Sequence, residues 1–262
     1  MPDNSLCKEG IFEDIRQACI VSRYELLKYF SGYKLLIFGI IVIAALVLLT
    51  LTSLIFQKDP SVNDIYSNYV SFVALLALLG AALFTSTTIC SEFEERTALV
   101  LFTKPIKKST IFFGKIAIAF VLNIVIFAIY YLVTMLVGLI VTGNVSIDIL
   151  ASFGYLVAYV FALTGIAVMF SSLMKRSSSA SILTFIFILL VPSLILSVIM
   201  LAQNNMNVTD YWYFLDSAST AITYSVSATQ TVSDGLRAVG VMIVWGLIPM
   251  IIGYLRFVKR EL

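Results

Sequence analysis

The chain has 262 residues, of which 60% are apolar and only 12% are charged, with a formal net charge of +2 at pH 7. A soluble domain is roughly 45–50% apolar and about 25% charged, so one water-facing globule cannot enclose this much apolar surface. The sequence contains no histidine, which excludes Ser-His-Asp and Cys-His catalysis, H-E-x-x-H zinc sites and His-ligated haem. The composition therefore predicts an all-α protein with several membrane spans and argues against a hydrolase.

Residues 1–34 are predicted to form a cytoplasmic segment that contains an amphipathic helix over Phe12–Phe30. Apolar side chains recur there at three- or four-residue steps or multiples of these, at Phe12, Ile15, Cys19, Leu26 and Phe30. We expect this helix to lie in the membrane interface, with its basic residues near anionic lipid. An extension of the first membrane helix into water is the alternative.

Six stretches have the roughly 20 apolar residues that a membrane helix needs, and they make residues 35–262 a six-helix transmembrane domain. The predicted spans are residues 35–56, 70–90, 113–141, 149–174, 181–201 and 238–254. The third is long enough to tilt or to extend beyond the bilayer. The sixth is short, which leaves open an earlier start.

The distribution of lysine and arginine orients these spans. Fifteen of the 17 basic residues fall in the leading segment, the second and fourth loops and the tail, and two fall in the loops between them. Cytoplasmic loops carry an excess of lysine and arginine, so both termini are predicted to be cytoplasmic in a multi-pass protein of the cell membrane. Lys115, near the cytoplasmic end of the third span, is expected to snorkel towards the interface.

The predicted outer region, residues 202–237, contains the aromatic run Tyr211-Trp212-Tyr213-Phe214. Such clusters favour the level of the lipid headgroups, so an anchor in the aromatic belt is the expected role and a lid over an outer opening is the alternative. The stretch Ala218–Thr231 is moderately apolar and rich in serine and threonine. It is predicted to form a short re-entrant or surface helix.

Small residues follow helical spacing along the second span, at Ala74, Ala77, Ala81, Thr85 and Thr88. Such a face allows close approach of another helix, which is the expected role, or lines a weakly polar path, which is the alternative. The middles of the spans contain no Asp, Glu, Arg or Lys. Their absence argues against ion-coupled secondary transport, which usually needs ionisable groups near the midplane.

The loop over residues 91–112 joins the second and third spans and is the most informative part of the sequence. Residues from Glu92 to about Phe102 are predicted to form a short cytoplasmic helix that is acidic at its N-terminus, and Pro105 ends it. A subunit docked on this helix would move both neighbouring spans. A solvated loop that is basic only because of the membrane topology is the alternative.

The same stretch resembles the E-x-E-x-G-T … P-x-x-R … G-K pattern of the exporter-like ABC-two permeases. Glu92 and Glu94 match the two acids, and Thr97 and Pro105 match the Thr and Pro. Gly114 and Lys115 match the final pair. Two positions depart from the pattern, because Lys108 replaces the Arg and Arg96 stands where Gly is more common. The architecture is similar over nearly the whole chain, whereas the motif is confined to residues 91–115.

The resemblance implies a permease subunit of the type V exporter fold. It would pair with a second copy or a paralogue and bind separate ABC ATPase subunits. The helix in 91–112 would be the coupling helix on the ATPase, and its coupling residues would be Glu92, Glu94, Thr97, Pro105, Lys108 and Lys115. Spans two and five would border the central path, which would give Ala77, Ala81, Thr85 and Thr88 a lining role.

No catalytic, cofactor or metal site is expected on this chain, and its expected partners include membrane lipid but no nucleic acid. The sequence has no G-x-x-x-x-G-K-[ST] phosphate loop, so ATP and Mg²⁺ are expected on the partner ATPase. An ATP-driven exporter subunit is the leading hypothesis. A subunit that passes motion to an extracytoplasmic partner through 202–237 is the second, an ion-coupled carrier is the third, and an intramembrane enzyme has the least support.

Overall fold

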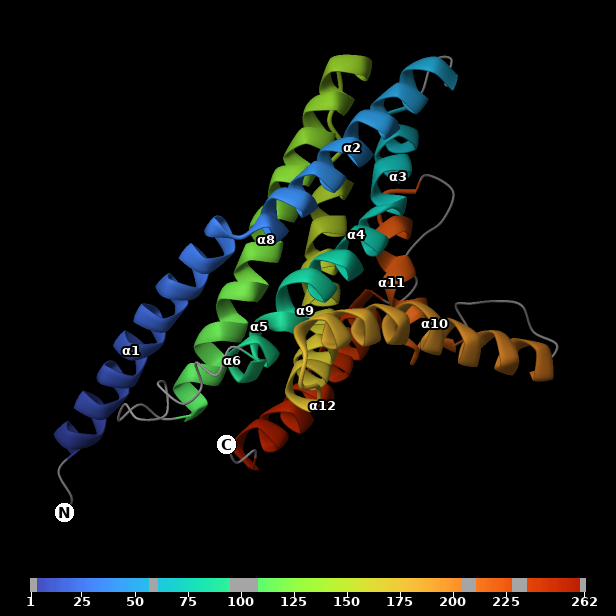
Figure 1. Ribbon diagram of the computed structural model, residues 1–262. Coiled ribbons are helices and arrows are strands. Elements are labelled where there is room, and N and C mark those ends of the chain that lie inside the picture. The colour runs from blue at the N-terminus through green and yellow to red at the C-terminus, as the bar shows by residue number, and fades with distance from the viewer. Residues whose placement is uncertain (1–3, 57–60, 95–107, 204–210, 228–234, 260–262) are drawn as a thin grey trace.

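The computed structural model describes residues 4–56, 61–94, 108–203, 211–227 and 235–259, and within these ranges the chain is helical and forms no strand (Figure 1). Six helical segments there are long and apolar enough to cross a membrane. The prediction of an all-α protein with six candidate membrane spans is therefore confirmed.

Four predicted spans correspond to single helices. These are α2 (Tyr33–Phe56), α8 (Lys108–Thr142), α9 (Asp148–Leu173) and α10 (Ser177–Gln203). Helix α8 begins at Lys108, so residues 108–112, predicted as the end of the loop 91–112, form its first turn.

The sixth span is α12 (Gly235–Lys259), which begins earlier and ends later than the predicted 238–254. The extension at its C-terminal end includes Arg256 and Lys259. Basic side chains in a last turn suit the partial negative charge of a helix C-terminus, so the helix continues beyond the apolar stretch.

The second span begins well before the predicted residue 70 and is built from several helical pieces. These are α3 (Val62–Ser71), α4 (Val73–Gly80), the π-helical turn η1 (Ala81–Thr85), α5 (Ser86–Thr88) and α6 (Cys90–Glu94). A capping box starts α3, because the Ser61 hydroxyl accepts a hydrogen bond from the Asp64 amide and the Asp64 carboxylate accepts one from the Ser61 amide. The candidate span as a whole is Val62–Glu92.

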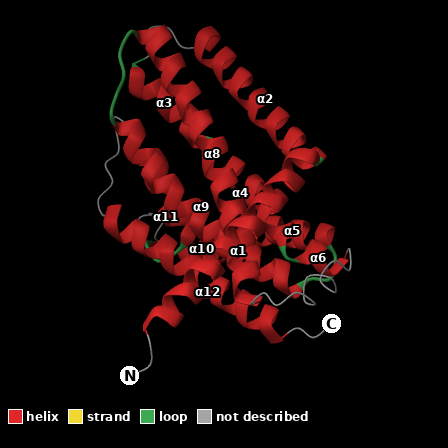
Figure 2. Cartoon of the chain, turned by 90° about the vertical axis from the view of Figure 1, so that its left-hand side faces the viewer, coloured by secondary structure: helices red, strands yellow, loops and turns green. Residues whose placement is uncertain are grey.

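Helix α1 (Asn4–Ser31) precedes the first span, and the chain bends sharply at Gly32 between α1 and α2 (Figure 2). The Ser22 hydroxyl donates to the carbonyl oxygen of Gly114 at 2.9 Å, which holds α1 against the start of α8. Helix α1 is thus a separate helix and not a straight extension of α2. Its exposed residues include Leu27 and Phe30, whereas Glu25 is buried. An apolar outward face fits the predicted interfacial position, which stays a prediction.

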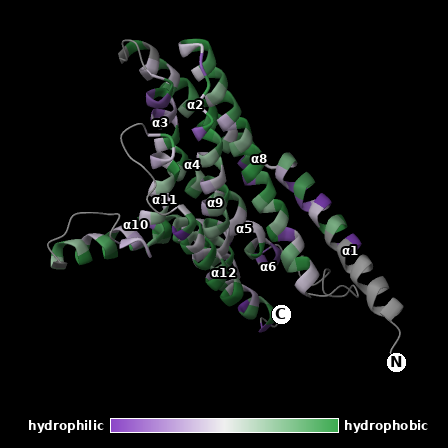
Figure 3. Ribbon diagram, turned by 180° about the vertical axis from the view of Figure 1, so that it is seen from behind, coloured by the Kyte–Doolittle hydropathy of each residue, from purple (hydrophilic) through white to green (hydrophobic). Residues whose placement is uncertain are grey.

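Helix α9 lies at the centre of the bundle, and its pairing with α12 is the most extensive contact between two helices. Most residues in the apolar parts of the second span and of α9 are buried, whereas only a minority of those in α2 and α10 are buried. Hydrophobic residues predominate along α2, α8 and α10 in Figure 3, and part of α10 projects from the bundle in Figure 1. Lipid or another protein must cover these faces in a membrane.

Within the predicted outer region, a short helix, α11 (Leu215–Tyr224), packs against α9, α12 and α3. The Ser152 hydroxyl on α9 donates to the carbonyl oxygen of Ile222 at 2.8 Å. Of the aromatic run before α11, Tyr211 and Phe214 are buried and pack against Leu196 of α10. The described part of the outer region therefore packs against α3, α9 and α12 through α11, and against α10 through Tyr211 and Phe214.

Candidate functional site

The candidate site is the short helix α6 at the end of the second span, together with the helices around it. Its position is fixed by Ser171 of α9, whose hydroxyl oxygen accepts hydrogen bonds from the amides of Ile89 and Cys90, both at 3.1 Å. Of the predicted coupling residues, Glu92, Glu94 and Lys115 have described side chains. Thr97 and Pro105 lie outside the described residues, and only the backbone of Lys108 is described.

A buried ion cluster joins α6 to α1 and α8. The Nζ of Lys115 on α8 is 2.7 Å from Oε2 of Glu25 on α1 and 2.7 Å from Oε1 of Glu92 on α6. The three side chains are only 5%, 7% and 13% exposed, respectively. Charges with so little access to water are stable only when they are paired, so this cluster requires its three helices to stay together.

A second cation lies beside this cluster at its more exposed side. The Nζ of Lys28 on α1 is 4.0 Å from Oε1 of Glu92 and donates to the Ser91 hydroxyl at 3.5 Å. Lys28 thus adds a second positive charge near the same Oε1 of Glu92 that Lys115 contacts. The two acids and two lysines hold the α1–α6–α8 junction by charge.

The expectation that Lys115 snorkels to the interface was wrong, because its ammonium group lies inside the chain between two carboxylates. Sequence reasoning also missed Glu25 as a member of the site. The signal that could have found it is its spacing, because Ser22, Glu25 and Tyr29 lie on one face of α1 and all three contact the bundle. A polar face of α1 is buried, which is the reverse of a soluble surface helix.

The second acid of the motif, Glu94, contacts a different helix. Its carboxylate accepts hydrogen bonds from the Ser177 amide at 2.8 Å and from the Ser177 hydroxyl at 2.5 Å. Ser177 begins α10, so Glu94 caps the start of the fifth candidate span from a distant part of the chain. The hydrogen bond from the Ser177 hydroxyl is the main cause that lowers the pKa of Glu94, and the nearby Arg176 and Lys34 lower it further.

This cap is expected to weaken in acid. Because the folded-state pKa of Glu94 is lowered, its contribution to stability is present at neutral pH and is lost as the pH falls through that lowered pKa. We expect Glu94→Gln to lower the melting temperature at about pH 7, and the difference from the wild type to shrink towards about pH 3. In a Ser177→Ala background, Glu94→Gln should lower the melting temperature by less. A difference in melting temperature between Glu94→Gln and the wild type that is constant over this pH range would contradict the capping of α10 by Glu94.

The small-residue face of the second span is buried by the chain itself. Ala77, Ala81, Thr85 and Thr88 all lie in the interior. The Thr88 hydroxyl is 2.9 Å from the hydroxyl of Tyr29 on α1. Packing within one copy is therefore favoured for these four positions over an open path.

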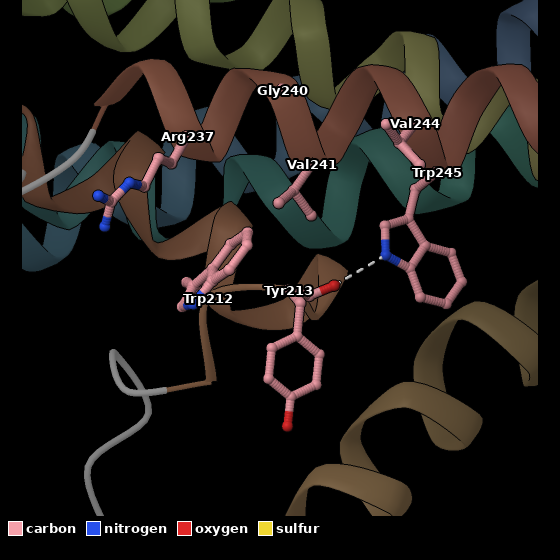
Figure 4. A pocket seen from close by; sticks show the side chains of 7 residues that line it. All are labelled: Trp212, Tyr213, Arg237, Gly240, Val241, Val244 and Trp245. Carbon is pink, nitrogen blue, oxygen red and sulfur yellow. Dashed lines mark hydrogen bonds between the residues drawn. The ribbon is translucent and has the colours of Figure 1, made fainter.

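A hollow of about 450 Å³ lies between the outer aromatic run and the start of α12 (Figure 4). Its lining residues are Trp212, Tyr213, Arg237, Gly240, Val241, Val244 and Trp245. The indole N–H of Trp245 donates to the carbonyl oxygen of Tyr213 at 3.1 Å. Trp212 and Tyr213 therefore face this hollow, whereas their neighbours Tyr211 and Phe214 are buried.

Comparison with known proteins identifies the family. The profile described as "ABC-2 family transporter protein" matches residues 60–262, which include α6, α8 and all later helices. The chain belongs to the ABC-2 transporter family. The ABC-2 match confirms the resemblance seen at residues 91–115, and it makes the chain a multi-pass membrane component of a transporter. Glu92, Glu94 and Lys115 lie inside the matched range, and Glu25 lies before it.

A relative of this ABC-2 chain is the "Uncharacterized membrane protein YdbK" of Bacillus subtilis (strain 168). The two are 24% identical over 215 residues, which cover 76% of this chain and 84% of the relative. The relative's name describes it as a membrane protein, and the aligned part covers most of both chains.

Proposed function

We propose that this ABC-2 chain is the membrane-spanning permease subunit of an ATP-driven exporter. Separate ABC ATPase subunits would bind ATP and Mg²⁺, and a second copy or a paralogue would complete the membrane domain. Both termini would lie in the cytoplasm, because nearly all lysines and arginines fall in the segments on that side. The observation that carries the proposal is the attachment of α6 to four other helices.

Each attachment of α6 uses a different contact. Glu92 reaches α8 and α1 through Lys115, Glu94 caps α10, and the start of α6 is bound by Ser171 of α9. Residues 95–107, which follow α6 directly, belong to the stretch 91–112 in which the resemblance places the coupling helix. A force on that segment would act on α1, α8, α9 and α10 together, because packed helices shift as bodies between discrete arrangements.

Association with an ATPase tests this function directly. The tagged chain, purified from native membranes under mild conditions, is expected to retain an ABC ATPase with an intact phosphate loop. Replacing residues 95–107 with a Gly/Ser segment of equal length is expected to abolish this association, since the docking segment is lost. The same replacement of residues 228–234 is the matched control and should leave the association unchanged.

Two results would contradict the exporter proposal. Transport by the purified chain alone in vesicles without ATP would show that no ATPase is needed. Recovery of the ATPase at the wild-type level after replacement of 95–107 would show that this segment is not the docking segment.

A mechanical subunit that acts on an extracytoplasmic partner is the second candidate. It is favoured by the attachment of α11 to α9 and α12, because motion of those spans would reach the outer region. In that case, substitution of Trp212 and Tyr213 by serine would abolish partner binding and leave the association with the ATPase intact. Substrate-stimulated ATP hydrolysis by the complex alone would instead support export.

A further inference from the structure

A cleft of about 930 Å³ opens where the α1–α2 bend faces α5, α6 and the first turn of α10. It adjoins the ion cluster, because Glu25 and Lys28 line it, and it is separate from the outer hollow. The volume lies at the upper end of ordinary ligand pockets, which are roughly 300–1,000 Å³. The bend at Gly32 forms one side of it, and Ser181 of α10 lies on the opposite side.

Two lysines provide the positive charge of this cleft. Lys28 is near the end of α1 and Lys34 is in the first turn of α2, so they lie on the two arms of the bend. The Nζ of Lys34 donates to the Thr87 hydroxyl at 3.1 Å, and that of Lys28 donates to the Ser91 hydroxyl at 3.5 Å. Both ammonium groups therefore point across the cleft towards α5 and α6, and ammonium groups are common ligands of phosphate.

Hydroxyl groups line the remaining polar wall. They come from α5, α6 and α10, and they belong to Thr87, Thr88, Ser91, Ser178 and Ser181. The Thr87 and Thr88 hydroxyls already donate to the carbonyl oxygens of Leu83 and Phe84. The Ser91 and Ser178 hydroxyls can rotate to donate to an anionic oxygen, so they suit a group with several acceptor oxygens. The two acids in the lining have partners in the chain, because Glu25 is bound by Lys115 and Glu94 caps Ser177.

Apolar residues continue from the cleft along two helices. Ile37 of α2 and Ile182 of α10 line it and are largely exposed. Further exposed apolar residues follow in the next turns, at Ile40 and Ile41 of α2 and at Ile186 and Leu189 of α10. The cleft thus has a polar part at the start of two candidate spans and an apolar part along them, which matches the headgroup level of a bilayer.

We propose that this cleft binds the phosphate headgroup of an anionic phospholipid, with Lys28 and Lys34 as its main ligands. The acyl chains would lie against the exposed faces of α2 and α10. The lipid would connect the α1–α2 bend to α10 across the intervening α5 and α6. This site does not depend on the ATPase partner, so it stands apart from the proposed function.

Lipid retention by the purified full-length chain tests the site. The wild type, exchanged into mixed phosphatidylcholine and phosphatidylglycerol, is expected to retain phosphatidylglycerol preferentially and to gain thermal stability from it. Lys28→Gln with Lys34→Gln should weaken this binding roughly 30-fold, about 2 kcal/mol, since each lysine near a lipid surface is worth about 1 kcal/mol. Arg256→Gln with Lys259→Gln removes the same charge at the end of α12 and should keep the preference.

A second pair of variants tests the cleft without changing any charge. Ser178 lines the cleft and Ser179 does not, and both are exposed in the first turn of α10. Ser178→Phe is expected to displace the lipid and Ser179→Phe to leave it bound. This pair also decides the matter if the double lysine variant fails to fold.

Three results would overturn the proposal. Equal retention of the two lipids would show that the cleft does not select an anionic headgroup. An equal loss of binding in both charge variants would show that Lys28 and Lys34 have no specific role. Full stabilisation by inorganic phosphate in neutral detergent, without added lipid, would assign the cleft to a free anion.

Discussion

Replacing Gly165 with alanine is expected to separate α9 from α12 and to produce one of the largest losses of stability in this chain. A Cβ at Gly165 would overlap the carbonyl oxygen of Gly246 and would lie 2.7 Å from its carbonyl carbon and 2.8 Å from its Cα. All three atoms are backbone, so no side-chain rotation relieves the overlap. Small residues at such crossings are what allow membrane helices to pack closely.

The expected cost exceeds the roughly 1–3 kcal/mol of ordinary overpacking, because two helix backbones must move apart. The measurement is the melting temperature and the yield of monodisperse protein in detergent. Gly246→Ala should cost less, because the atoms nearest to its Cβ would be ring atoms of Phe161 at 2.7 Å, which can shift, and the backbone oxygen of Phe161 lies farther away at 3.1 Å.

The same two helices provide matched controls. Gly154 on α9 and Gly240 on α12 have no atom within 4 Å of an added Cβ. Alanine at either position should leave the melting temperature unchanged or raise it slightly, because alanine has a higher helix propensity than glycine by about 1 kcal/mol. Equal melting temperatures for Gly165→Ala and Gly154→Ala would contradict the close crossing of α9 and α12.

Hydropathy predicted the lipid-facing helices and missed the part of the second span that other helices enclose. Asn63, Asp64 and Asn68 lower the apolar content of α3, so the predicted span began only at residue 70. The same segment buries Tyr66 and Tyr69 inside the protein. A segment that is shielded from lipid by its neighbours needs less hydropathy than one in direct contact with the bilayer.

The motif at residues 91–115 identified Glu92 and Glu94 as site residues, but it could not predict which side chains they contact. Glu25 precedes Lys115 by 90 residues, so their contact follows from how α1 folds back on α8. The capping of α10 by Glu94 likewise joins residues that are 83 positions apart. Local spacing identifies which residues share a face, whereas contacts over such separations depend on the arrangement of the helices.

Lys115→Met is the second substitution with a large expected effect, because it leaves the carboxylates of Glu25 and Glu92 facing each other without their shared cation. Removing one partner from a buried ion pair costs about 3–5 kcal/mol. Lys115 pairs with both acids at 2.7 Å, and Lys28, at 4.0 Å from Glu92, compensates that acid less closely. We expect a steep fall in melting temperature and in folded yield. Lys175→Met, at an exposed position of the same end, should change the stability by less than about 0.5 kcal/mol.

The triple variant Glu25→Gln, Glu92→Gln and Lys115→Met separates stability from coupling. Neutral residues of similar size remove the uncompensated charges, so folding is expected to recover in large part. The charge contacts that join α6 to α1 and α8 remain absent, so under the proposed function ATP hydrolysis should persist while its stimulation by substrate is lost. If Lys115→Met has the melting temperature of the wild type, the buried cluster is excluded. If the triple variant keeps full stimulation of ATP hydrolysis by substrate, α6 acts through Glu94 and Ser171 alone.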